Sequence, residues 1–220
     1  MIDLGRRMSR AYLLALLGAL VMTALVVSGI APYDRATWLM KGGPVLIGVP
    51  LLLATYHRFP LTALLYVVIA LHAFVLILGG AYTYARVPLG FWLQGLFALK
   101  RNPYDRIGHF MQGFAPALIA REVLLRGRHV SSPRMAAFLS GCVALAVSAS
   151  YELIEWWAAL ALDEGVDAFL GTQGDPWDTQ SDMFMALIGA VTALLTLARR
   201  QDRQMDGLIA SATGRPASGR

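Results

Sequence analysis

Carboxylate and imidazole side chains recur at helical spacing in three segments of this chain. Within each segment they are separated by three or four positions, so they lie on one face of a helix. The three sets are Asp105, His109 and Gln112; Ser148, Glu152 and Glu155; and Asp178 and Asp182. Side chains of these types can bind a divalent cation or relay protons.

A divalent metal is the first ligand that these side chains suggest. Oxygen and nitrogen donors on facing helices form the metal sites of helical bundles and suit Zn, Mn or Fe. The candidate metal ligands are Asp105, His109, Glu152, Glu155, Asp178 and Asp182. In a catalytic site, His109, Glu155 and Asp182 would be ligands or the general acid and base. The metal would activate water for hydrolysis of a lipid or phosphate ester.

Four further residues are candidates for holding a polar or anionic ligand. The guanidinium of Arg106 can hold an anionic headgroup, and Tyr84, Gln173 and Asp175 are expected close to it. A lipid or an anionic small molecule is therefore a candidate ligand of the same site.

Two strings with the same pattern also allow a plainer interpretation of some acids. Asn102-Pro103-Tyr104-Asp105 and Asp175-Pro176-Trp177-Asp178 each place a capping residue, a proline, an aromatic residue and an acid in order. This order is typical of a helix start. It does not account for His109 or Asp182, which follow one turn later.

The composition indicates that these residues belong to a membrane protein. Of the 220 residues, 57% are hydrophobic and 15% are charged, and the mean hydropathy is +0.56. Soluble domains contain about 25% charged residues. The net charge of +5 does not indicate nucleic acid, because the arginines lie in short loops between apolar segments. Cys142 is the only cysteine, which excludes an intramolecular disulfide and a zinc site built from cysteines.

Six apolar segments predict an all-α, polytopic membrane helix bundle. They cover residues 11–30, 43–57, 61–80, 104–124, 135–162 and 181–198. Segment 86–100 is too short to cross and is predicted to be an interfacial or re-entrant helix. Residues 1–200 then form one transmembrane domain, and the polar residues 201–220 are predicted to be a flexible cytoplasmic tail.

The distribution of basic residues predicts the orientation of this bundle. With the N-terminus in the cytoplasm, most of the 19 lysines and arginines fall on the inner side, so both termini are predicted to be cytoplasmic. The three sets of polar side chains then lie at one depth near the outer face. On this topology Lys41 belongs to an outer loop, Tyr84 lies at the outer rim, and Glu122 is a surface partner of neighbouring arginines.

The polar cluster allows three interpretations. It is a site for a divalent metal or polar ligand, a proton-coupled pathway for a small solute, or a purely structural network of buried ion pairs. Ionisable groups inside a membrane are expensive and usually face one another or a cavity. Buried ion pairs also occur without any catalytic role.

Several polar strings resemble those of a known family. TYARVPLG (83–90), RNPYDRIGHFMQGF (101–114), REVLLR (121–126), SYELIEW (150–156) and GTQGDPWDTQSDM (171–183) are similar to strings of the YjdF family of bacterial inner-membrane proteins. The resemblance covers most of residues 60–190. It implies a small multi-pass protein of the bacterial inner membrane and supplies no reaction. A fainter similarity to VanZ-like proteins rests on a histidine, a later glutamate and paired aspartates before a last helix.

Overall fold

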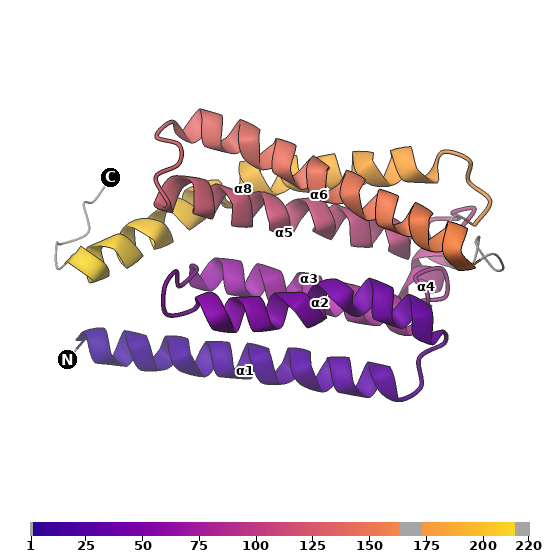
Figure 1. The fold of residues 1–220 in the computed structure, drawn as a ribbon, viewed down its shortest axis with the longest axis horizontal. Coiled ribbons are helices and arrows are strands. Elements are labelled where there is room, and N and C mark those ends of the chain that lie inside the picture. The colour runs from indigo at the N-terminus through magenta and orange to yellow at the C-terminus, as the bar shows by residue number, and fades with distance from the viewer. Residues whose placement is uncertain (1, 163–172, 214–220) are drawn as a thin grey trace.

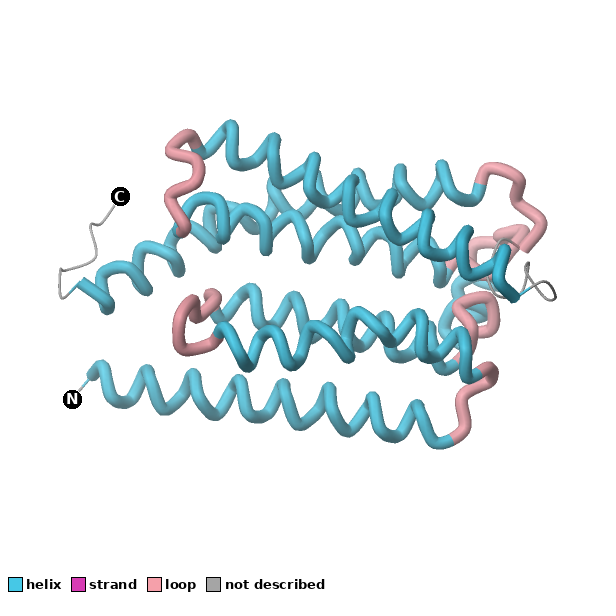
Figure 2. The backbone as a smooth tube through the Cα atoms, in the orientation of Figure 1, coloured by secondary structure: helices cyan, strands magenta, loops and turns pink. Residues whose placement is uncertain are grey.

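The protein is a bundle of helices, as the sequence predicts (Figures 1 and 2). The structure is a computed structural model that describes residues 2–162 and 173–213, and these residues form seven helices and no strand. The helices are α1 (Ile2–Ile30), α2 (Arg35–Thr55), α3 (Ala63–Ala81), α4 (Pro88–Leu96), α5 (Tyr104–Arg126), α6 (Pro133–Leu162) and α8 (Asp178–Thr213). Five of them, α1, α2, α3, α6 and α8, are long and apolar enough to cross a membrane.

The long helices form two layers of three. Helices α1, α2 and α3 make one layer, helices α5, α6 and α8 make the other, and α3 packs against α5 between them (Figure 1). The short helix α4 lies at one end of the bundle, which we call the α4 end. The opposite end, where α1 begins and where α8 reaches Thr213, is called the N-terminal end. Helix α4 matches the short helix predicted within residues 86–100, and its Phe91 and Trp92 are exposed.

Helices α1, α2 and α8 are all clearly longer than the predicted segments, and the extra turns of α2 and α8 bear on the interior of the bundle. Helix α2 begins at Arg35 because Asp34 caps it, accepting a hydrogen bond of 2.6 Å from the backbone N–H of Thr37. That hydrogen bond lowers the pKa of the Asp34 carboxyl. Lys41 is therefore a buried residue in the second turn of α2, and its predicted placement in a loop is wrong.

Helix α8 continues well past the predicted end of the last span. It runs to Thr213, and Gln201 and Met205 within it are buried. The predicted tail of residues 201–220 is thus helical as far as Thr213, and residues 214–220 lie outside the described part of the chain.

Helix α5 has several polar side chains and lies at the centre of the bundle. It is not among the five helices that are apolar enough to cross a membrane. It packs against α3, α6 and α8, so protein rather than lipid surrounds its polar side chains. This position explains how a segment with Asp105, His109 and Gln112 on one face lies within an apolar bundle.

Helices α5 and α8 approach each other closely through glycines. A Cβ at Gly113 would overlap the backbone oxygen of Ala186, and a Cβ at Gly189 would overlap the backbone oxygen of Phe110. Close backbone approach of this kind is how small residues hold helices together in membranes. It fixes the distance between the polar faces of α5 and α8.

Replacing Gly113 or Gly189 with alanine is expected to destabilise the protein. The added methyl meets backbone that cannot rotate away, and overpacking of this type costs about 1–3 kcal/mol. Gly18→Ala is the matched control, because a Cβ at Gly18 meets nothing within 4 Å. Thermal unfolding in detergent measures the difference, and equal melting temperatures for the three variants would contradict the expectation.

A buried polar network joins three helices near the N-terminal end. The Glu122 carboxylate accepts hydrogen bonds from the backbone N–H of Thr62 at 2.8 Å and from its hydroxyl at 2.7 Å. It also accepts hydrogen bonds from Arg126 at 2.7 Å and from Gln201 at 3.3 Å. Glu122 is fully buried, so its predicted position on the surface is wrong, although it does pair with Arg126.

Candidate functional site

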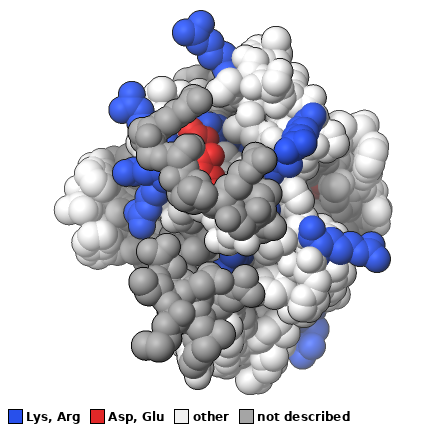
Figure 3. Space-filling view, turned by 90° about the vertical axis from the view of Figure 1, so that its left-hand side faces the viewer, with Lys and Arg blue, Asp and Glu red and all other residues white. Residues whose placement is uncertain are grey.

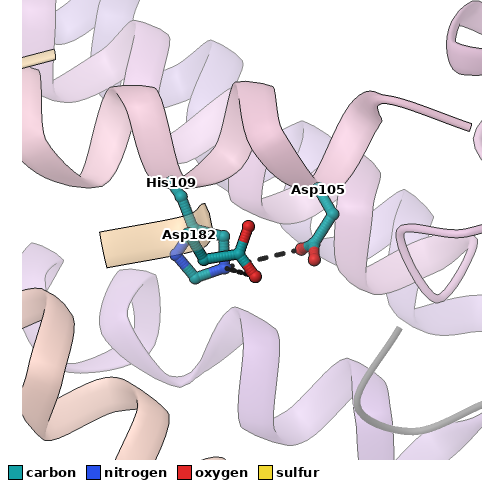
Figure 4. Close-up of side chains that lie close together, drawn as sticks. All are labelled: Asp105, His109 and Asp182. Carbon is teal, nitrogen blue, oxygen red and sulfur yellow. Dashed lines mark ion pairs between the residues drawn. The ribbon is translucent and has the colours of Figure 1, made fainter. Parts of the chain in front are cut away.

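Two helices bring an imidazole and two carboxylates together towards the α4 end of the bundle. Asp105 and His109 come from α5, and Asp182 comes from α8 (Figure 4). Nε2 of His109 lies 3.6 Å from Asp105 Oδ1 and 3.7 Å from Asp182 Oδ2. All three side chains are buried, and one potential ligand atom from each lies within 4.8 Å of the others. We call these three residues the Asp–His–Asp cluster.

The two repeated strings of the sequence set the starts of α5 and α8. The side chain of Asn102 accepts a hydrogen bond of 3.0 Å from the backbone N–H of Tyr104. The side chain of Asp175 accepts the equivalent bond, also of 3.0 Å, from Trp177. Both strings therefore do precede helices, but the helices begin later than predicted: Pro103 is the N-cap of α5 and forms no side-chain cap bond, and α8 begins at Asp178. Because the strings align Asp105 with Asp178 and His109 with Asp182, similar helix starts at the α4 end bring His109 and Asp182 to similar depths.

Glu152 of α6 completes the surroundings of the imidazole. Its Oε1 lies 3.5 Å from Nδ1 of His109, on the opposite side of the ring from the two aspartates. Both ring nitrogens of His109 thus face carboxylates. Asp105 Oδ1, His109 Nδ1, Glu152 Oε1 and Asp182 Oδ1 are buried and form no hydrogen bond within the protein. Such atoms are costly unless a ligand satisfies them.

Glu155 has a different partner from the one the sequence suggested. It forms a buried ion pair with Lys41 of α2, across the two layers of the bundle. The Lys41 ammonium also lies 4.9 Å from the ring centre of Tyr84 and 5.4 Å from that of Tyr151. Glu155 therefore neutralises a lysine next to the Asp–His–Asp cluster and is not part of the cluster.

Tyr84 is buried beside Lys41 and does not lie at an outer rim. Its ring occupies the space that side chains at Gly79 of α3 and Gly108 of α5 would fill. Its backbone has a positive φ of 53°, and its N–H donates a hydrogen bond of 2.8 Å to the Gly79 oxygen. Tyr84 thus anchors the chain after α3 against α5.

The remaining predicted residues form a charged group above the cluster, at the α4 end. Asp178 pairs with Arg101 at 2.5 Å, and Asp175 lies 3.7 Å from Arg101 and 3.4 Å from Arg106. The Gln173 side chain exchanges two hydrogen bonds, of 3.1 and 3.0 Å, with the backbone of Asn102. Asp178 is therefore engaged by an arginine, and Gln173 ties the segment before α8 to the start of α5.

Two further buried polar atoms lie among these helices. Ser148 of α6 is fully buried, and its hydroxyl has no hydrogen-bond partner within the protein. The same holds for Nε2 of His72 in α3, which lies within electrostatic range of His109. The polar face predicted for Ser148, Glu152 and Glu155 therefore does point into the bundle.

Comparison with known proteins identifies relatives of the whole bundle. Residues 13–203 match a family described as predicted membrane protein (DUF2238). The chain is 60% identical over 188 residues to the protein called Inner membrane protein YjdF of Escherichia coli (strain K12), which covers 85% of this chain and 90% of that relative. The resemblance found in the polar strings is thereby confirmed. No solved structure matches the chain significantly.

Proposed function

Because this chain belongs to the DUF2238 family of predicted membrane proteins, we propose that it is a multi-pass membrane protein that binds a divalent metal ion at the Asp–His–Asp cluster. One observation carries the proposal: three buried ligand atoms from two helices lie within 4.8 Å of one another. The unsatisfied Oδ1 atoms of Asp105 and Asp182 support it, since a cation would compensate both buried carboxylates.

The spacing of the ligand atoms agrees with a small transition-metal ion. Two ligands about 2.1 Å from a tetrahedral Zn²⁺ lie about 3.4 Å apart. The separations of 3.6 and 3.7 Å between His109 and the two aspartates are close to this value. Two carboxylate oxygens and one imidazole nitrogen are donors that Zn, Mn and Fe all accept.

Glu152 has the geometry of a residue that orients the metal-binding imidazole. Metal-bound histidines usually donate their second ring N–H to a carboxylate, which fixes the tautomer and strengthens the ligand. Glu152 faces Nδ1 of His109, whereas both aspartates face Nε2. We therefore assign Asp105, His109 and Asp182 as ligands and Glu152 as the partner of the histidine.

Three protein ligands leave a coordination position for water or a polar ligand, as in catalytic zinc sites. A bound ion there would supply Lewis acidity for hydrolysis of an ester. Asp182 and His109 would act as ligands in that reaction. Glu152 would keep its contact with Nδ1 of His109 on the far side of the ring, and Glu155 is paired with Lys41.

The charge distribution supports an orientation with the cluster near the outer face. Lysine and arginine side chains surround the N-terminal end of the bundle (Figure 3). Arg58, Arg128, Arg134, Arg199, Arg200 and Arg203 are exposed. In the inner membrane, positive loops stay in the cytoplasm. This orientation places both termini in the cytoplasm and the α4 end outside.

A proton-coupled transporter is the second candidate and has less support. Such a route would have to connect the cluster with the N-terminal end. Among the described residues, fully buried Ala117, Ala144 and Ala190 pack together between α5, α6 and α8. These alanines offer no group that could relay a proton, so this part of the bundle gives the transporter no support.

Metal titration of the purified, demetallated protein tests the proposal. One Zn²⁺, Mn²⁺ or Fe²⁺ per chain is expected, and X-ray absorption is expected to report one nitrogen donor among oxygens. If the protein binds none of these three ions, either in detergent or in lipid nanodiscs, the metal proposal is wrong and the cluster is a structural network.

Glu152→Gln is expected to weaken metal binding without abolishing it. The amide can still accept a hydrogen bond from His109 but loses the negative charge, and loss of such a partner lowers metal affinity about 10- to 100-fold. Competition with a chelator measures the dissociation constant. A variant that binds as tightly as the wild type would mean that Glu152 does not orient the imidazole.

A further inference from the structure

A cavity of about 770 Å³ opens at the N-terminal end of the bundle, away from the Asp–His–Asp cluster. It lies where α5 ends, where α6 begins and where α8 continues beyond its apolar part. Leu125, Pro133 and Met205 contribute apolar walls, and five of the other lining side chains are charged. We call this cavity the α5–α8 pocket.

Two of the five charged side chains already have a partner. Arg126 pairs with Glu122 at 2.7 Å, and Asp202 pairs with Arg121 at 2.7 Å. The other three are exposed and form no ion pair within the part of the chain that the structure describes. They are Arg199, Arg203 and Asp206. The pocket thus offers two cations and one anion to a ligand.

These three charges lie just beyond the membrane-spanning part of α8. Val191 and Leu195 precede Arg199 by two turns and by one turn on the same face, and both are exposed, Leu195 by 81%. Residues 178–198 extend about 31 Å at the helical rise, close to the thickness of about 30 Å of the hydrocarbon core. Arg199 therefore lies at the depth where the lipid phosphates begin, whichever way the protein is oriented.

The order of the charges along α8 matches one kind of lipid headgroup. Arg199, Arg203 and Asp206 are four and three residues apart, so they share a face and follow one another away from the bilayer. The sequence of groups is an apolar stripe, two cations and then one anion. A phospholipid with a primary amine has the complementary order of acyl chains, phosphate and ammonium.

The same charges select against other lipids. Guanidinium groups such as those of Arg199 and Arg203 bind phosphate through paired hydrogen bonds. The Asp206 carboxylate can accept hydrogen bonds from a primary ammonium, which has three N–H donors. A quaternary ammonium has no such donor, and a headgroup that is only negative would place its charge near this carboxylate. A free phosphate would leave the apolar stripe and Asp206 unused.

We propose that the α5–α8 pocket binds the headgroup of phosphatidylethanolamine from the adjacent leaflet, with the phosphate at Arg199 and Arg203 and the ammonium at Asp206. The acyl chains then follow the exposed apolar side chains of α8 into the bilayer. The bound lipid bridges α8 and the turn between α5 and α6. The proposal is independent of metal binding, because the Asp–His–Asp cluster belongs to the opposite end of the bundle.

Native mass spectrometry of the delipidated, full-length protein tests the proposal. Dissociation constants are measured for phosphatidylethanolamine, phosphatidylglycerol and phosphatidylcholine with the same acyl chains. Phosphatidylethanolamine is expected to bind about tenfold more tightly than the other two, the effect of one hydrogen bond between charged groups. Equal affinities for the three lipids, or tighter binding of either of the other two, would overturn the proposal.

Asp206→Asn separates the contact with the amine from the contact with the phosphate. The variant is expected to lose about tenfold in affinity for phosphatidylethanolamine, because the amide no longer attracts the ammonium. Its affinity for phosphatidylglycerol should stay the same or rise, since a negative charge has been removed. If Asp206→Asn keeps the preference of the wild type for the amine lipid, the proposed arrangement of the headgroup is wrong.

Two double variants distinguish the pocket from the general positive charge of this end. Replacing Arg199 and Arg203 with glutamine is expected to weaken phosphatidylethanolamine binding about tenfold or more. Replacing Arg58 and Arg200 with glutamine is the matched control, because both are exposed at the same end and neither lines the pocket. Thermal unfolding shows that both proteins are folded. Equal losses of lipid affinity in the two double variants would refute the proposal.

Discussion

Asp182→Asn is expected to lower the affinity for zinc by about 100-fold or more. The change preserves the shape of the side chain but removes the one carboxylate that α8 contributes to the Asp–His–Asp cluster. Loss of an orienting partner alone costs about 10- to 100-fold in metal affinity, and loss of a direct ligand is expected to cost at least as much. Chelator competition on the demetallated variant measures the effect.

Asp175→Asn is the matched control for this experiment. It removes a carboxylate from the same end of the bundle, but Asp175 pairs with Arg101 and Arg106 and does not belong to the cluster. Its zinc affinity should stay close to that of the wild type. Equal losses in the two variants would show that general negative charge, and not the geometry of the cluster, attracts the ion.

Glu122→Ala is expected to lower the free energy of unfolding by about 3–5 kcal/mol, the cost of removing one partner from a buried ion pair. The variant leaves the Thr62 backbone N–H without its acceptor at the start of α3, and Arg126 loses its ion pair. Gln201 of α8 also loses one of its contacts. Thermal and denaturant unfolding in detergent measure the loss.

Asp206→Ala provides the comparison for Glu122→Ala. Asp206 is an exposed acid in α8, so its removal is expected to change the free energy of unfolding by less than about 0.5 kcal/mol. If the two variants unfold at the same temperature, the Glu122 network contributes nothing to stability. Metal binding should survive Glu122→Ala in the folded fraction, because the network belongs to the opposite end of the bundle.

The helical segments and the faces of the polar helices could be predicted from the sequence for a physical reason. Apolar length identifies a span, and spacing by three or four residues identifies a face. These two rules placed Asp105 and His109 on one side of α5 and brought Asp182 to the same depth. The two repeated strings also predicted that α5 and α8 begin at the same level, and Asn102 and Asp175 form matching turns just before these helices.

The partner of Glu155 could not be predicted in this way. The second apolar segment was predicted to begin at residue 43, after Lys41, whereas Asp34 starts the helix two turns earlier. The sequence did contain one indication that Lys41 is buried: it directly follows three apolar residues, Trp38-Leu39-Met40, and no other charged residue is near it. Pairing between α2 and α6 is a property of how the two layers meet, and local spacing within one helix contains no information about it.

Glu122 was misplaced for a related reason. Two arginines nearby in the sequence suggested a solvated ion pair at the end of a span. Its burial depends on α8 continuing beyond the membrane-length segment, so that Gln201 covers it. The length of α8 could not be inferred from hydropathy, because the mostly charged and polar residues 199–206 interrupt its apolar pattern.

The polarity of α5 has a consequence for biogenesis. Helix α5 has charged residues near both of its ends and is not apolar enough to cross a membrane by itself, so it gains little from leaving the translocon alone. Its companions α6 and α8 are synthesised afterwards. We therefore expect nascent α5 to leave the translocation pore fully only when α6 and α8 have emerged to cover its polar face.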